Sequence, residues 1–250
     1  MTEMVTEKEY DIQYYEIDYK RRLLITSLMN YLGDIATRQS EELGVGIDYL
    51  RDQGIAWVLY KWSIDIDRYP VYGEKIKVRT KPYSFKKFYA YRIFEILDLN
   101  GNIIARANSV WFLIDIEKRK AIRVTEDMYK AYGISKEKSD ILDIKKLKCP
   151  EKIHSEKSFN VRYSDIDTNR HVNNVKYVDW AIETVPLDVV TNYSIKGINI
   201  TYQKETTYGA VVKVFTEIRE EENRYICLHK IVDENDIELT VLETNWEREN

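Results

Sequence analysis

The chain repeats one pattern of residues in its two halves, and this repeat constrains the fold more than any other feature. Ile17-Asp18-Tyr19-Lys20 lies 149 positions before Ile166-Asp167-Thr168-Asn169, and an amphipathic stretch follows each tetrad. Further along, an isoleucine-rich segment and a Tyr-Gly pair recur with an offset of 136 positions, as Ile64-x-Ile66 with Tyr72-Gly73 and as Ile200-x-Tyr202 with Tyr208-Gly209. Because both halves carry the same series, the sequence predicts one ancestral unit that has been duplicated.

Each half is expected to begin with a short strand and a helix, and several strands follow. In the first half Trp62, Ile64 and Ile66 alternate with polar residues, which is the period of a half-buried strand. Asp98-Leu99-Asn100-Gly101-Asn102 is a strong turn between residues 88–97 and 103–116, and predicts a hairpin. The corresponding strands of the second half are expected at residues 198–204, 210–218, 224–232 and 237–246. The pattern predicts an α+β chain in which an antiparallel sheet wraps around one long central helix in each half.

The repeat also predicts the domain organisation. Residues 1–134 form the expected N-terminal domain and residues 153–250 the C-terminal domain. Residues 135–152 are the expected linker, because they are rich in lysine and glutamate and close on Cys149-Pro150.

Composition excludes several classes of protein. With 250 residues, 44% of them hydrophobic, the chain can bury one large core or two ordinary ones. A net charge of −4 and a pI near 5.6 argue against nucleic acid as the main partner. Neither a membrane-spanning stretch nor a signal peptide is visible, so we expect a cytoplasmic location and no membrane insertion. Cys149 and Cys227 lie far apart, which predicts free thiols and no zinc site.

Polar groups crowd the run from Asp165 to Trp180, at the expected start of the second-half helix. Valines and isoleucines at helical spacing follow, namely Val175, Val178, Ile182 and Val185. Asn173 or Asn174 is the expected N-cap residue. The free backbone N–H groups at such a helix terminus would face negative charge that develops beside His171. Caps and turns also favour these residue types, so the segment alone leaves a structural interpretation open.

Two motifs give the segment a chemical interpretation. Asp167-x-Asn169-x-His171, followed by Val172-Asn173-Asn174-Val175-Lys176-Tyr177, resembles the signature of the acyl-acyl carrier protein (acyl-ACP) thioesterases. Tyr202-Gln203-Lys204-Glu205-Thr206 resembles the segment of that family that carries the catalytic glutamate. The resemblance implies a tandem (double) hotdog fold. The family commonly has cysteine after the glutamate, whereas this chain has Thr206, which argues against a thiol nucleophile.

The resemblance implies that Asp167, Asn169, His171 and Glu205 are catalytic, and that the reaction is hydrolysis of fatty acyl-ACP to free fatty acid. From the chemistry of these groups we expect Glu205 to activate or orient water, and Asn169 and His171 to position water or polarise the carbonyl. Asp167 would then orient His171 or Asn169. The expected partner is the acyl carrier protein, no metal or cofactor is implied, and a homodimer is an open alternative.

The first half differs where chemistry would lie. Tyr19 and Lys20 stand at the positions of Thr168 and Asn169, Arg22 stands at that of His171, and Tyr69 stands at that of Glu205. We therefore expect the N-terminal domain to keep the scaffold with a degenerate site and to hold an acyl-chain pocket. Aromatic residues such as Trp57 and Phe85 are candidates for its lining.

Three other functions fit parts of the pattern. A hotdog acyl-CoA thioesterase would use the same chemistry, and a noncatalytic sensor would bind acyl thioesters without the carboxylates and amides. A dehydratase would pair a histidine with a carboxylate, which fits the amide-rich motif less well. Two lysine groups could receive an acidic carrier, namely Lys81, Lys86 and Lys87, and Lys145, Lys146 and Lys148.

Overall fold

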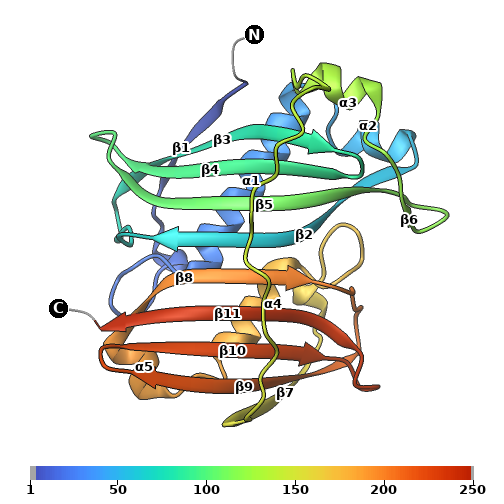
Figure 1. Cartoon of the computed structure of the whole chain (residues 1–250). Coiled ribbons are helices and arrows are strands. Elements are labelled where there is room, and N and C mark those ends of the chain that lie inside the picture. The colour runs from blue at the N-terminus through green and yellow to red at the C-terminus, as the bar shows by residue number, and fades with distance from the viewer. Residues whose placement is uncertain (1–3, 249–250) are drawn as a thin grey trace. The chain divides into compact units, whose positions relative to one another are not determined.

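The chain divides into two compact units in the computed structural model, which describes residues 4–248 (Figure 1). The first unit takes Met1–Tyr60 and Ile66–Asp143, and the second takes Lys61–Asp65 and Ile144–Asn250. The change from one unit to the other after Asp143 falls inside the span 135–152 that was expected to be a linker.

The first unit is an antiparallel sheet with one long helix. Its strands follow the order β1-β3-β4-β5-β2, with β6 beside β5, and α1 contacts β1 and β3 (Figure 1). The buried face of α1 presents Leu28, Leu32 and Ile35 at helical spacing, and the helix ends before Gly44, whose φ of 72° suits glycine. The elements are β1 (Thr6–Asp11), η1 (Tyr14–Glu16), α1 (Ile25–Glu42), α2 (Ile47–Asp52), β2 (Ile55–Ile66), β3 (Lys75–Lys86), β4 (Tyr89–Asp98), β5 (Ile103–Asp115), β6 (Lys120–Ala121) and α3 (Glu126–Ala131).

The second unit repeats this plan. Its strands follow the order β8-β11-β10-β9-β7, and Lys61–Asp65 of β2 pairs with residues 197–201 of β8. The helix α4 contacts β9 and β10. The elements are β7 (Ser155–Asn160), η2 (Tyr163–Asp165), α4 (Asn174–Ile182), α5 (Leu187–Asn192), β8 (Tyr193–Tyr202), β9 (Val211–Glu221), β10 (Arg224–Val232) and β11 (Glu238–Arg248).

The helix of the second unit is shorter than the sequence pattern predicts. It has 9 residues, against 18 in α1, and ends at Ile182 although Val185 continues the helical spacing. Pro186 explains the difference, because a proline disfavours helical geometry in the residue before it and cannot donate a backbone hydrogen bond. Pro186 instead serves as the N-cap of α5, and Val185 is buried just beyond the helix.

Contacts recur in the two units at the offsets found in the sequence. An ion pair links the first strand of each unit to its helical segment. Lys8 pairs with Asp34 in α1 at 2.7 Å, and Lys157 pairs with Glu183, the C-cap residue of α4, at 3.7 Å. An indole nitrogen donates to a hydroxyl two residues earlier, at 2.7 Å from Trp111 to Ser109 and 2.8 Å from Trp246 to Thr244. The repeat therefore extends from the strand order to individual side-chain contacts.

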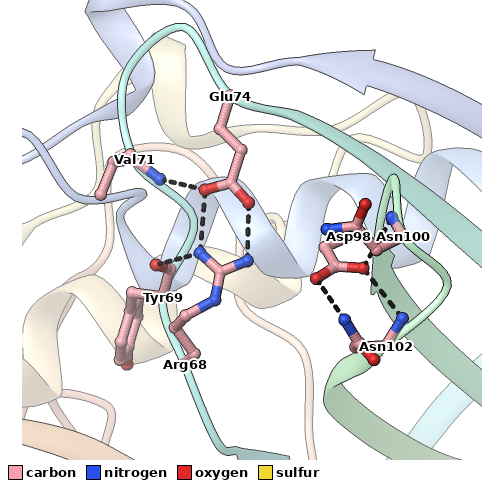
Figure 2. Close-up of polar contacts among 7 residues, drawn as sticks. All are labelled: Arg68, Tyr69, Val71, Glu74, Asp98, Asn100 and Asn102. Carbon is pink, nitrogen blue, oxygen red and sulfur yellow. Dashed lines mark hydrogen bonds and ion pairs between the residues drawn. The ribbon is translucent and has the colours of Figure 1, made fainter.

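An aspartate organises the hairpin turn of each unit. Asp98 accepts hydrogen bonds from the backbone N–H groups of Asn100 and Asn102, at 2.9 and 2.8 Å (Figure 2). In the second unit Asp233 accepts from Asn235 and Ile237, both at 2.9 Å. These bonds explain why the predicted turn forms, because an aspartate at this position supplies the acceptor that the turn backbone needs. Across residues 4–248, every helix is too short or too polar to cross a bilayer.

Candidate active site

A tight loop carries three of the predicted site residues between η2 and α4. The carboxylate Oδ1 of Asp167 accepts the backbone N–H groups of Asn169 and His171, at 2.8 and 3.3 Å. The N–H of Asp167 donates back to the carbonyl of His171 at 2.8 Å, and Arg170 makes the reversal with a φ of 66°. The carboxylate of Asp167 therefore stabilises the backbone of this loop. The expected role was different, namely to orient the side chain of His171 or Asn169.

Glu205 reaches the same loop from the connection between β8 and β9. Its Oε2 lies 3.1 Å from Nδ1 of His171, and the two side chains keep 38% and 27% of their surface exposed. The backbone fixes this approach, because the N–H of Val172 donates to the carbonyl of Thr206 at 2.9 Å. The structure thus places an imidazole against a carboxylate at a position that a substrate can reach.

Asn169 lies on the exposed side of the loop. Within residues 4–248, no hydrogen bond joins its side-chain amide to Asp167, His171 or Glu205. The structure therefore brings His171 and Glu205 into contact, links Asp167 to them through the backbone, and leaves the amide of Asn169 facing solvent.

The loop leads directly into the N-terminus of α4. Asn173 is the N-cap, and its Oδ1 accepts the N–H of Val175 at 3.0 Å, which decides between the two expected cap residues. The N–H of Asn174, the first residue of the helix, makes no hydrogen bond among the described residues. A donor at the positive end of a helix can stabilise a developing oxyanion nearby.

The first unit contains the same loop without the same chemistry. The N–H of Arg22 donates to Oδ1 of Asp18 at 2.9 Å, and that of Leu23 donates to the carbonyl of Pro70 at 2.8 Å. Both bonds match those of the second unit, but the guanidinium of Arg22 stands where His171 stands, 5.8 Å from the ring centre of Tyr69. Tyr69 follows Arg68, whose guanidinium binds both carboxylate oxygens of Glu74 (Figure 2). The first copy therefore lacks the imidazole–carboxylate pair.

Two tyrosines of the second unit were not singled out as functional by sequence reasoning. Tyr177 in α4 and Tyr202 at the end of β8 lie with their ring centres 5.9 Å apart, and Tyr202 donates to the carbonyl of Asn174 at 3.1 Å. Comparison of the two halves of the sequence distinguishes these tyrosines, because their counterparts in the first unit are the aliphatic residues Leu28 and Ile66. No group of three or more histidine, cysteine or acidic side chains in the described part of the chain could hold a metal ion.

Comparison with known families decides how to interpret this geometry. The model of the acyl-ACP thioesterase N-terminal domain matches residues 3–132, and that of the acyl-ACP thioesterase C-terminal domain matches residues 149–248. The chain belongs to the acyl-ACP thioesterase family. The resemblance seen in the two motifs is thereby confirmed.

Three relatives of this member of the acyl-ACP thioesterase family come from plants. The dodecanoyl-ACP hydrolase of Cinnamomum camphora is 24% identical over 97% of this chain and 68% of its own length. Acyl-ACP hydrolase FATB1 of Cuphea viscosissima is 28% identical over 99% of this chain and 62% of its own length. The palmitoyl-acyl carrier protein thioesterase of Arabidopsis thaliana is 26% identical, and the match covers 86% of this chain and 55% of the relative. All three are described as chloroplastic.

Solved structures confirm the tandem hotdog fold. A putative oleoyl thioesterase from Lactobacillus plantarum superimposes with a TM-score of 0.90 at 25% identity, covering 99% of this chain and 98% of that one. The 12:0-ACP thioesterase from Umbellularia californica has a TM-score of 0.85 at 23% identity, covering 98% and 94%.

Proposed function

We propose that this chain hydrolyses the thioester of fatty acyl-ACP to a free fatty acid and the carrier's thiol. The observation that carries the proposal is the 3.1 Å contact between Nδ1 of His171 and Oε2 of Glu205, beside the N-terminus of α4. A carboxylate, an imidazole and helix N–H donors together supply what thioester hydrolysis needs, namely an activated water and a site for the oxyanion. Membership of the acyl-ACP thioesterase family supports the same assignment.

Glu205 is the proposed base. It takes a proton from a water molecule that His171 and Asn169 help to position, and the resulting hydroxide adds to the thioester carbonyl carbon. The N–H at the start of α4 and the amide of Asn169 stabilise the oxyanion that forms. When the tetrahedral intermediate collapses, the thiolate leaves and takes up the proton held by Glu205. A thiol with an ordinary pKa of about 8.5 is a good leaving group, so the departure needs little further acid catalysis.

Asp167 has a supporting part in this scheme. By accepting the backbone N–H groups of Asn169 and His171, its carboxylate sets the positions of both residues. Thr206 has no nucleophilic part in this scheme, because the attacking group is the water that Glu205 activates. Its carbonyl accepts the N–H of Val172. The proposed reaction therefore proceeds without a covalent acyl-enzyme.

The proposal extends to the partner, the acyl chain and the location. The carrier protein delivers the acyl group, and the first domain, residues 1–134, binds the chain. A core cluster there includes Phe85, Leu113, Met128 and Tyr132, with Trp57 packed against it, and could open to admit an alkyl chain. A cytoplasmic location and a homodimer stay predictions, and the named relatives are chloroplastic.

Release of thiol from matched substrates tests the function. The purified chain is given a series of acyl-ACP esters of increasing chain length and the corresponding acyl-CoA esters, with the double variant His171→Ala/Glu205→Ala as the blank. We expect release from acyl-ACP by the natural chain only. Faster release from CoA esters would replace the carrier by CoA, and no release from either series would favour a noncatalytic acyl-thioester sensor.

A further inference from the structure

Arg92 is a buried cation in the first unit. It lies in β4 with 8% of its surface exposed, and shares a face of the strand with the buried residues Ala90 and Phe94. Its side chain reaches α1, where Nη1 donates to Oε1 of Gln39 at 2.5 Å. The same nitrogen donates to Oγ1 of Thr80 in β3 at 3.2 Å. The guanidinium is therefore held between the sheet and the helix.

The partners of this guanidinium are neutral. Besides the amide of Gln39 and the hydroxyl of Thr80, Arg92 contacts the ring of Tyr132, with its guanidinium carbon 5.6 Å from the ring centre. Within residues 4–248, no aspartate or glutamate pairs with Arg92. Burial lowers the pKa of Arg92, and contact with Tyr132 opposes this shift. An arginine is rarely buried without an anion, because removing its charge from water is costly.

The carboxylate that is reached along the hydrogen bonds of Gln39 belongs to Glu42. The amide of Gln39 donates to Oγ1 of Thr6 at 3.2 Å, and Thr6 donates to Oε2 of Glu42 at 3.5 Å. Glu42 is exposed and already pairs with Arg38 at 2.8 Å. Two side chains therefore separate this carboxylate from Arg92, and it does not supply the missing anion.

The repeat indicates that the scaffold does not need a cation at this position. Arg92 pairs with Pro82 in the first sheet, and Cys227 pairs with Ile218 at the equivalent place in the second. Cys227 is completely buried and carries no positive charge. The helical partner of the guanidinium also lies in the part of α1 that the shorter α4 lacks. The cation and its support are thus features of the first unit alone.

An apolar cluster lies directly beside the guanidinium. Tyr132, whose ring contacts Arg92, belongs to the core cluster already proposed to admit an alkyl chain. Phe85 of the same cluster packs edge-on against Tyr132 with the ring centres 5.6 Å apart. Ala90, on the same face of β4 as Arg92, is a further member. A cation at the border of an apolar cluster suits a ligand with one negative end and a long apolar chain.

We propose that the first unit binds a free fatty acid, with the carboxylate on Arg92 and the alkyl chain in the core cluster. The carboxylate supplies the missing anion, because a guanidinium can bind both of its oxygens. The alkyl chain gains by leaving water for apolar surroundings. A free fatty acid is also the product of the proposed reaction, so product and substrate compete for the same cluster. That kinetic consequence rests on the proposed function, whereas the binding does not.

Binding of dodecanoate without any carrier protein tests the proposal. Isothermal titration calorimetry on the natural chain compares dodecanoate with dodecanol, which has the same alkyl chain and no charge. We expect dodecanoate to bind at least ~10-fold more tightly, because only the carboxylate pairs with the buried cation. Equal affinities, or no binding of dodecanoate, would overturn the proposal. This comparison needs no variant.

Arg92→Gln locates the carboxylate. Glutamine keeps a polar side chain without the charge, so the affinity for dodecanoate should fall at least ~10-fold and that for dodecanol should not. Dodecanoate should raise the melting temperature of the natural chain but not that of Arg92→Gln. The control is Arg106→Gln, which changes an exposed arginine of β5 and should bind as the natural chain does. Unchanged affinity in folded Arg92→Gln contradicts the proposal.

The double variant His171→Ala/Glu205→Ala separates this site from the catalytic one. It should bind dodecanoate as tightly as the natural chain, because both changes lie in the second unit. Loss of binding in the double variant, with normal binding in Arg92→Gln, would place the acid in the catalytic site and overturn the proposal.

Turnover gives a further readout. Dodecanoate should raise the KM of the natural chain for acyl-ACP without lowering kcat, and an unchanged KM would contradict competition for one cluster. Absence of thiol release by a natural chain that binds dodecanoate through Arg92 contradicts the proposed function alone.

Discussion

Nδ1 of His171 lies 3.1 Å from Oε2 of Glu205, although the two residues come from different connections of the second unit. The backbone bond from Val172 to Thr206 joins the residues that follow them, so the contact is set by the main chain as well as by the side chains. This relationship makes the site sensitive to any change that separates the two segments.

Removal of either member of the pair should abolish most of the activity. We expect His171→Ala and Glu205→Gln each to lower kcat/KM by at least ~10²-fold, the usual scale for a catalytic acid–base or oxyanion-stabilising group. Asn169→Ala should have an effect of the same order. Arg22→Ala, at the counterpart of His171, is the control and should keep normal turnover. Thiol release together with circular dichroism checks both parts, and a folded His171→Ala chain with normal turnover would exclude His171 from the site.

Thr206→Ala should keep most of the activity. The carbonyl of Thr206 accepts the N–H of Val172, and alanine preserves that bond. The side-chain hydroxyl has no part in the proposed attack by water. Steady-state kinetics and mass spectrometry after rapid quenching measure the outcome. An acyl group trapped on residue 206, or a loss as large as that of Glu205→Gln, would reverse the assignment of the nucleophile.

Substitutions of Asn173 should separate helix capping from catalysis. Asn173→Ala removes the acceptor for the N–H of Val175, and loss of an N-cap costs about 1 kcal/mol. A chain of this size should then melt about 2–4 °C lower. Asn173→Asp keeps the cap and the melting temperature, but adds a negative charge where the oxyanion forms, so kcat/KM should fall about 10-fold. Full activity of Asn173→Asp would argue against an oxyanion at this helix end.

His229 should make the fold sensitive to acid. It is completely buried, with Nδ1 2.8 Å from Oγ1 of Thr216 and Nε2 3.1 Å from Oγ1 of Thr244, and burial lowers its pKa to about 3. In the unfolded chain its pKa is about 6.5, so the unfolded state binds the proton first. The contribution of neutral, buried His229 to the free energy of unfolding is complete above pH 6.5. It declines as pH falls toward 3, by up to about 1.4 kcal/mol per pH unit.

Urea unfolding between pH 7.5 and 4.5 measures this effect. His229→Gln lacks the titrating group, so its free energy of unfolding should depend less steeply on pH than that of the natural chain. His154→Gln changes an exposed histidine and serves as the control, with the natural slope expected. Equal slopes for all three chains would contradict the assignment.

Carrier docking should depend on salt and on one group of lysines. Lys145 binds both oxygens of Glu243 at 2.8 Å, although 58% of its side-chain surface stays exposed. Lys146 and Lys148 are exposed as well, and so are Lys86 and Lys87. Reversal of charge at the pair that binds the carrier should lower kcat/KM for acyl-ACP, with less effect on kcat and on CoA esters.

The advantage of acyl-ACP over CoA esters should shrink with added salt, because the Debye length is only about 8 Å at physiological ionic strength. Equal use of both esters at low salt by all variants would refute carrier steering.

Periodicity and turn chemistry were sufficient to predict most of the fold. The turn at Asp98 and the strands on either side of it follow from residue types alone. For the N-cap of α4, residue types leave Asn173 and Asn174 open, and the hydrogen bond from Val175 decides for Asn173. The end of α4 depends on Pro186, which overrides the hydrophobic spacing that continues to Val185. The contact of His171 with Glu205 follows from the resemblance to a family and not from spacing, because periodicity does not specify how two distant connections meet. The edge-on contact of Tyr177 with Tyr202 depends on how α4 meets the end of β8, which only the three-dimensional structure gives.

The two loops with the same backbone and different side chains have an evolutionary consequence. Asp18 and Arg21, with a φ of 65° at Arg21, hold the first loop in the shape that Asp167 and Arg170 give the second. The shape therefore does not depend on the residues that react, and selection can exchange those residues without rebuilding the chain. In the first unit, substitutions at Lys20, Arg22 and Tyr69 would be the shortest route by which a second reaction centre could arise in the same molecule.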